Sequence, residues 1–159
     1  MAARGTVVVS KEWVKLSPDQ AWEAIVPCDL PTFFTGMKPA IPAISEVTDQ
    51  AGDWDGAGQT RTIHLADGSS VSETIDEVDR PGVFRYTVGP FNGALDKLVE
   101  HAKGEFIFED LGGGTSVRWT YDWKPRPGMR PVVIVLAKFW SAYSRRVLTD
   151  LIKAAKPPQ

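Results

Sequence analysis

The chain has little of the chemistry that marks metalloproteins or disulfide-stabilised proteins. Its 159 residues contain one cysteine, Cys28, and two histidines, His64 and His101. A single cysteine excludes an internal disulfide framework and suits a reducing compartment. The three residues also lack the spacing of metal ligands, so we expect no metal site, and the sequence indicates no cofactor.

Long apolar runs and an excess of one charge are missing as well. The longest apolar run, residues 132–137, is far too short to span a bilayer. Residues 1–10 lack the apolar stretch of a secretory signal, so we expect a cytoplasmic protein. A formal net charge of -2 offers no broad basic surface, and we expect no nucleic-acid partner.

Two familiar catalytic patterns are not found. No serine occupies a strained turn between a strand and a helix, as it does in hydrolases with a Ser-His-Asp triad. The glycine run at 112–114 precedes a strand rather than a helix, which favours a hairpin turn over a phosphate-binding loop.

What the sequence does contain is a hairpin with two very different faces. Residues 58–65 and 70–78 are predicted to be strands joined at Asp67-Gly68, where a three-residue loop can place the glycine in the left-handed region. Side chains alternate across a strand, so this register makes one face wholly polar. The other face carries Arg61, Ile63, Leu65, Val71, Glu73 and Ile75. A loop one residue longer or shorter would leave neither face uniform, which favours this pairing.

The charged pair on the apolar face is the main functional clue. Burying a charge is costly unless it is paired and hydrogen-bonded. Arg61 and Glu73 are therefore either a structural ion pair that sets the strand register or the polar anchor of a cavity. The residues alone leave both interpretations open.

The remaining segments predict an antiparallel sheet. Further strands are expected at 6–14, 44–49, 83–88, 104–109 and 115–123. Two short helices are expected between the first two strands, at 18–26 and near 29–36. The first of them begins with a capping box formed by Ser17 and Gln20.

Residues 131–155 predict a long amphipathic helix. Its apolar side chains recur at three- and four-residue spacing: Val132, Leu136, Phe139, Trp140, Tyr143, Val147 and Leu151. The inner face of the sheet is the one large apolar surface available to it, so the helix should lie across the sheet's concavity. We expect a single α+β domain over residues 1–159, with its core at about 6–155.

This order of elements resembles the helix-grip fold of the SRPBCC superfamily, also called START or Bet v 1-like. It is most similar to the bacterial polyketide cyclase/dehydrase branch, over roughly residues 7–151. The local marks are Ser17-Pro18 before Trp22, Gly52-Asp53-Trp54 with Gly58 and Arg61, Asp67-Gly68, Glu73, and Gly114-Thr115 before Val117-Arg118-Trp119. The resemblance implies a seven-stranded antiparallel sheet wrapped around the C-terminal helix. It specifies fold better than activity, because the superfamily includes carriers, receptors and enzymes.

The resemblance also implies a cavity between the sheet and the long helix. Candidate ligand-binding residues are Arg61, Ile63, Leu65, Val71, Glu73, Tyr86, Val88, Phe106, Phe108, Trp119, Tyr121, Leu136, Trp140 and Tyr143. We expect the partner to be a small hydrophobic molecule, aromatic, polyketide or lipid-like, and the protein to be a monomer or homodimer.

Three functions remain open at this point. The first is binding of such a molecule, with Arg61 and Glu73 anchoring its polar end. The second is polyketide cyclisation and dehydration, in which Arg61 stabilises an enolate oxygen and Glu73 or a tyrosine moves a proton. The third is a protein-interaction module that uses the outer face of the sheet. Binding is favoured, because Arg61 should keep the Glu73 carboxylate ionised, which suits an anchor at least as well as an acid.

Overall fold

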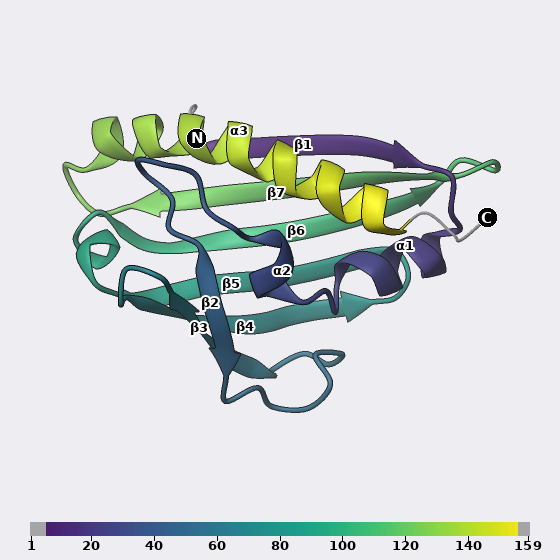
Figure 1. Cartoon of the computed structure of the whole chain (residues 1–159), viewed down its shortest axis with the longest axis horizontal. Helices are drawn as coiled ribbons and strands as arrows, with labels where there is room; N and C mark the ends of the chain where they lie inside the picture. The colour runs from purple at the N-terminus through teal and green to yellow at the C-terminus, as the bar shows by residue number, and fades with distance from the viewer. Residues whose placement is uncertain (1–5, 156–159) are drawn as a thin grey trace.

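A seven-stranded antiparallel sheet with the strand order β1-β7-β6-β5-β4-β3-β2 forms the body of the protein (Figure 1). The computed structural model describes residues 6–155, so residues 1–5 and 156–159 of the expected domain lie outside it. The strands are β1 (Val7–Val14), β2 (Ile44–Thr48), β3 (Thr60–Leu65), β4 (Ser70–Asp79), β5 (Val83–Asn92), β6 (Val99–Asp110) and β7 (Thr115–Pro125). The predicted helix-grip fold is confirmed.

The helices lie on the concave side of this sheet (Figure 1). They are α1 (Pro18–Ile25), α2 (Leu30–Phe33) and α3 (Arg130–Ala155), while the single-turn 3-10 helix η1 (Ala94–Lys97) lies in the connection between β5 and β6. The capping box predicted at α1 is confirmed: the Ser17 hydroxyl accepts a hydrogen bond from the Gln20 backbone N–H at 3.2 Å, and the Gln20 side chain accepts one from the Ser17 N–H at 3.0 Å. No helix among the described residues combines the length and the apolar composition that crossing a membrane requires.

The buried face of α3 differs from the prediction in its first two turns. Val132 is 48% exposed and Leu136 is only half-buried, whereas Val133 and Ala137 are buried. Residues 132–137 are apolar at every position, so their spacing cannot identify the buried side, and contact with the sheet decides it. Further along, the predicted face is confirmed by the burial of Trp140, Tyr143, Val147 and Leu151.

Strands β5 and β6 are longer than predicted. The prediction ended β5 before Gly89 and Pro90, which normally interrupt strands. The structure instead passes through them with a β-bulge, because Val71 pairs with Phe91 while Glu73 pairs with Val88, leaving one extra residue in β5. The bulge turns Phe91 inward, where it is buried. Strand β6 begins at Val99 rather than at residue 104, so His101 lies within it.

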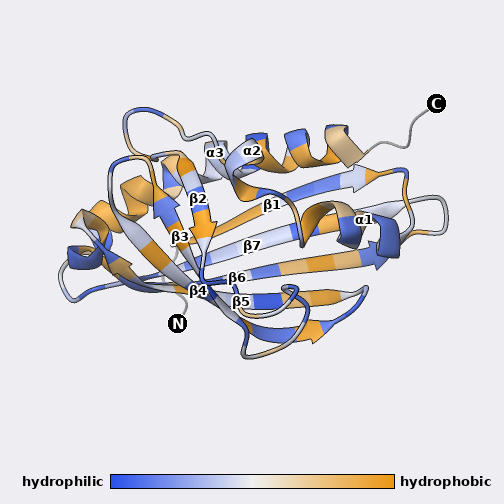
Figure 2. Cartoon of the chain, turned by 60° about the horizontal axis from the view of Figure 1, so that its bottom comes forward, coloured by the Kyte–Doolittle hydropathy of each residue, from blue (hydrophilic) through white to orange (hydrophobic). Residues whose placement is uncertain are grey.

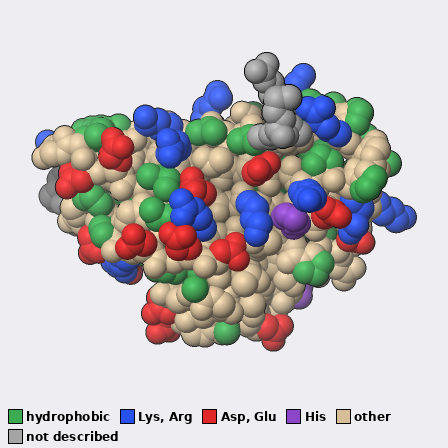
Figure 3. Space-filling view, turned by 180° about the vertical axis from the view of Figure 1, so that it is seen from behind, with side chains coloured by type: hydrophobic (Ala, Val, Ile, Leu, Met, Phe, Trp, Pro, Cys, Tyr) green, Lys and Arg blue, Asp and Glu red, His purple; other side chains and the backbone are tan. Residues whose placement is uncertain are grey.

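The two sides of the sheet have opposite character. Hydrophobic and hydrophilic bands alternate along the strands, as period-two patterning requires (Figure 2). Seen from behind, the convex face carries intermixed acidic and basic side chains (Figure 3). Arg85 of β5, for example, contacts Glu77 and Glu105 at 2.7 Å each. The aromatic side chains therefore collect on the concave side, beneath the helices.

Candidate functional site

The β3–β4 hairpin has the predicted register. Arg61 pairs with Glu73 and Ile63 pairs with Val71. Gly68 has φ 89, the left-handed conformation that the turn requires. The Asp67 carboxylate accepts a hydrogen bond from the Ser69 backbone N–H at 2.9 Å and holds the turn closed.

Arg61 and Glu73 form a buried ion pair. The Arg61 Nε and Nη2 atoms contact the same carboxylate oxygen, Oε1 of Glu73, at 2.8 Å and 2.6 Å. Each residue is only 7% exposed. The guanidinium also lies over the Trp54 ring, 3.9 Å from its centroid, in a cation–π contact. The pair is therefore satisfied on one side by a double contact and covered on another by an aromatic ring.

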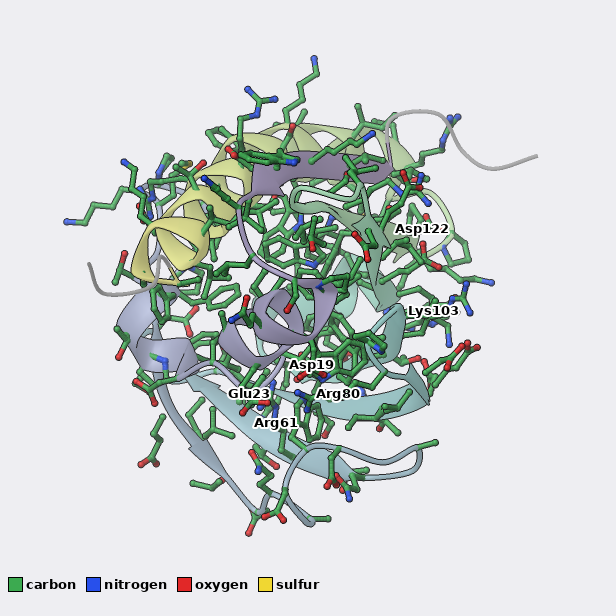
Figure 4. All side chains as sticks on the ribbon, turned by 90° about the vertical axis from the view of Figure 1, so that its right-hand side faces the viewer. Asp19, Glu23, Arg61, Arg80, Lys103 and Asp122 are labelled. Carbon is green, nitrogen blue, oxygen red and sulfur yellow. The ribbon has the colours of Figure 1, made fainter. Side chains whose placement is uncertain are left out.

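A surface ion pair near α1 gives a useful contrast. Arg80 contacts Asp19 at 2.8 Å and Glu23 at 3.1 Å, and all three side chains are largely exposed (Figure 4). Water screens such pairs, so they contribute little to stability. The Arg61–Glu73 pair is buried, so water does not screen it in this way.

An apolar cavity of about 130 Å³ lies next to the Arg61–Glu73 pair, between the sheet and the helices. Twelve of the fourteen candidate residues line it: Arg61, Ile63, Leu65, Val71, Glu73, Tyr86, Val88, Phe106, Trp119, Tyr121, Trp140 and Tyr143. The structure thus brings side chains from β3 to β7 and from α3 around one space.

Phe108 and Leu136 do not line this cavity. Phe108 packs against Trp22 of α1, with ring centroids 5.4 Å apart, because α1 covers that end of the sheet. Leu136 lies on the early part of α3, where the buried face is turned away from the predicted one. Both residues are packing positions at the edges of the core.

Several residues of the cavity wall could not be predicted from the sequence, because they lie in loops or around the short helices. Trp54 lies in the loop between β2 and β3, at φ 60, and is only 3% exposed. A large aromatic side chain inside a loop rich in Gly and Asp was the one available signal. The segments around α1 and α2 contribute Ile25, Val26, Cys28, Leu30, Phe34, Ile41 and Pro42.

A second, more polar pocket of about 360 Å³ adjoins the first. The two share four wall residues, Cys28, Leu30, Trp54 and Arg61. The outer pocket is completed by Pro27, Asp29, Val47, Gln50 and Asp53. Arg61 and Trp54 therefore separate an outer polar space from an inner apolar one.

Gly104 shapes the inner wall by its lack of a side chain. It pairs with Tyr86 on one side and with Tyr121 on the other. A Cβ atom on Gly104 would lie 2.1 Å from Cζ of Tyr86, so the Tyr86 ring occupies the space above this glycine. The ring thereby reaches across β6 to β7, where its hydroxyl accepts a hydrogen bond from Trp119 Nε1 at 2.9 Å.

Burial shifts the ionisation of the groups around the cavity. It raises the pKa of the Glu73 carboxyl, and the neighbouring Arg61 opposes this shift. Burial likewise raises the pKa values of Tyr86 and Tyr121 well above their ordinary value, so both phenols stay protonated. The pKa of the Cys28 thiol rises to about 12, again mainly through burial. Such a thiol is not a nucleophile near neutral pH.

The described residues do not form a metal-binding site. Within residues 6–155, no three His, Cys, Asp or Glu side chains are grouped in a way that could hold a metal ion. The Nε2 atom of His64 is 2.7 Å from the Thr48 hydroxyl, on the other face of the hairpin. The functional groups that line the cavity are thus one ion pair and several phenol and indole side chains, and the rest of the wall is apolar.

Comparison with known proteins places the chain in a family. A family model described as polyketide cyclase / dehydrase and lipid transport matches residues 5–156. A search of curated proteins gave no match. Among solved structures, norcoclaurine synthase from Thalictrum flavum in complex with dopamine and hydroxybenzaldehyde is similar at TM-score 0.67. The two chains are 17% identical, over 96% of this chain and 88% of that one.

Two other solved structures are similar to the same degree. XoxI from Bacillus cereus has TM-score 0.66 and 14% identity, over 94% of each chain. Ara h 8.0201 has TM-score 0.63 and 16% identity, over 92% of this chain and 97% of that one. At such identities the likeness concerns the fold alone. With the family match across nearly the whole sequence, the chain belongs to the polyketide cyclase/dehydrase and lipid transport family of the SRPBCC, or Bet v 1-like, superfamily.

Proposed function

We propose that the protein binds a small hydrophobic molecule in the cavity between the sheet and α3, and that the Arg61–Glu73 pair marks its polar end. The observation that carries the proposal is an apolar cavity with a single satisfied ion pair in its wall. Ligand sites in proteins have this composition, with apolar walls and a few placed polar groups.

The cavity's size narrows the ligand. Its volume of about 130 Å³ is close to the ~150 Å³ of an engineered apolar cavity that holds benzene. The buried part of the ligand is therefore about one aromatic ring. A lipid chain or a multi-ring polyketide would need the aromatic side chains of the wall to move.

The enzymatic alternative has less support in the geometry. Stabilising an enolate oxygen requires donors aimed at the substrate. Arg61 instead directs Nε and Nη2 to Glu73 and stacks on Trp54. If the protein were a cyclase, Arg61→Met or Glu73→Gln would abolish turnover of a poly-β-keto substrate while retaining affinity for it. The outer-face alternative is also weaker, because ion pairs such as those of Arg85 already occupy part of that face.

Binding can be tested with toluene, a single-ring probe of the right size. Isothermal titration calorimetry and the ligand-dependent rise in melting temperature should both report saturable binding, because a ligand that binds only the folded state stabilises it. Ile63→Trp should abolish the effect, since Ile63 lines the cavity and the larger ring fills it.

Ile107→Trp is the matched control. Ile107 lies on β6 but is not part of the cavity wall, so this variant should bind toluene like the wild type. Equal binding of toluene by both variants, or no binding of any single-ring aromatic compound by the wild-type protein, would overturn the proposal.

A further inference from the structure

Several polar side chains of the cavity wall have hydrogen-bonding capacity that no described residue uses, and the indole Nε1 atoms of Trp123 and Trp140 are two of them. The Tyr121 hydroxyl makes no hydrogen bond with any residue in 6–155, although Tyr121 is only 6% exposed. Tyr86 accepts its bond from Trp119, and its own O–H donates to no described group. Both contacts from Arg61 end on Oε1 of Glu73, and Oε2 accepts no hydrogen bond in the same part of the chain.

The Tyr86, Tyr121 and Glu73 side chains lie around the same cavity. The Tyr86 and Tyr121 ring centroids are 6.3 Å apart, since Gly104 between them has no side chain. In this cavity burial raises the pKa of both phenols, and the charge of Glu73 adds to the shift. The Tyr143 hydroxyl, which accepts from the Gly36 N–H and donates to no described group, lines the same cavity. The cavity wall therefore presents three O–H donors and one carboxylate acceptor.

From this arrangement we infer that the cavity selects an uncharged aromatic hydroxyl compound of the phenol class over a hydrocarbon or a carboxylate of similar size. This inference rests on the proposed binding function. A hydroxyl group can donate to Glu73 Oε2 and accept from Tyr121 or Tyr86 at once. A carbonyl can only accept, and a hydrocarbon leaves the polar groups of the wall unpaired, which is costly in a buried site.

Charge argues against a carboxylate ligand. Arg61 is the only basic residue in the walls of the two pockets, as far as the described residues go, and Glu73 already neutralises it. The outer pocket adds the carboxylates of Asp29 and Asp53. An anionic ligand would have to compete with Glu73 for Arg61 or lie beside an unscreened negative charge.

Calorimetric titration of the wild-type protein with phenol, toluene and benzoate at neutral pH tests the selection. Phenol and toluene have nearly the same size, and an entirely apolar cavity would prefer toluene, because the phenol hydroxyl would lose its bonds to water. We expect phenol to bind at least as tightly as toluene and benzoate to bind at least tenfold more weakly than phenol.

Tyr121→Phe removes one donor and keeps the ring. It should weaken phenol binding about tenfold, the value of roughly one good hydrogen bond, and leave toluene binding within about twofold. Thr87→Val is the matched control, because Thr87 lies on β5 outside the cavity wall and its hydroxyl donates to the Asp76 carboxylate at 2.6 Å. It should change neither affinity.

The possible failures are distinguishable. If toluene binds more tightly than phenol, or if the affinity for benzoate is within tenfold of that for phenol, the inferred selection is wrong and the proposed binding function stands. Equal losses of phenol affinity in Tyr121→Phe and Thr87→Val would also overturn it. If none of the three compounds binds, the proposed function itself fails. The order of the wild-type affinities decides the matter even if a variant does not fold.

Discussion

Removing Glu73 should destabilise the protein far more than removing both members of its ion pair. Glu73→Ala deletes the one carboxylate within residues 6–155 that contacts Arg61 and leaves a guanidinium that is 7% exposed. Breaking a buried pair from one side costs roughly 3–5 kcal/mol. That is a large share of the ~5–15 kcal/mol by which proteins of this size are stable. The Trp54 ring offsets only part of this loss, because a cation–π contact contributes about 0.5–2 kcal/mol.

The double variant is the decisive comparison. Replacing Arg61 by Met and Glu73 by Leu leaves no unpaired charge and keeps the side-chain volumes similar, so its stability should be near that of the wild type. The raised pKa of Glu73 agrees with this expectation, because it indicates that burial disfavours the ionised form even beside Arg61.

Urea denaturation at neutral pH provides the measurement, with the midpoint and slope compared among variants. Asp19→Ala serves as the control, since it breaks the exposed pair with Arg80 and should cause no measurable loss. A loss below about 1 kcal/mol for Glu73→Ala would refute the reasoning, because it would mean that water reaches the stranded guanidinium freely.

Three further outcomes follow from the same geometry. Gly104→Ala places a Cβ atom 2.1 Å from the Tyr86 ring and should cost about 1–3 kcal/mol in urea denaturation, whereas Gly113→Ala, with open space around it, should cost nothing measurable; equal effects would contradict the packing described for Tyr86. All three tyrosines, Tyr86, Tyr121 and Tyr143, have raised pKa values, so the stability they contribute is complete below pH 10.0 and is lost as the pH rises through their folded-state pKa values. Ultraviolet absorbance should therefore show tyrosinate forming only together with unfolding, and an independent step near pH 10.0 would count against it. Cys28, with a pKa of about 12, should react with a thiol reagent much more slowly in the native protein than in urea, and equal rates would show that the thiol is not shielded.

The register of the β3–β4 hairpin could be predicted because its determinants are local. Alternating polar and apolar residues allow only one pairing that separates the faces, and Gly68 fits the turn between the strands. The cross-strand contact of Arg61 and Glu73 follows directly from that pairing. The same holds for the capping box at Ser17 and Gln20, whose partners are three residues apart.

The wall of the cavity could be predicted only where it lies on regular strands. Trp54 comes from a loop and Phe91 follows a β-bulge, so no period in the sequence marks either as facing inward. On α3, an uninterrupted apolar run at 132–137 hides which side is buried, and Leu136 was placed wrongly for that reason.

Alternation and turn chemistry in the sequence by themselves determined the fold class, the hairpin register and the burial of one ion pair. The tertiary structure alone decided the size of the cavity and which of its polar groups are left without partners. The reason is physical: strand pattern depends on neighbours in the chain, whereas the space above Gly104 and the free hydroxyl of Tyr121 depend on how β5, β6 and β7 pack beneath α3.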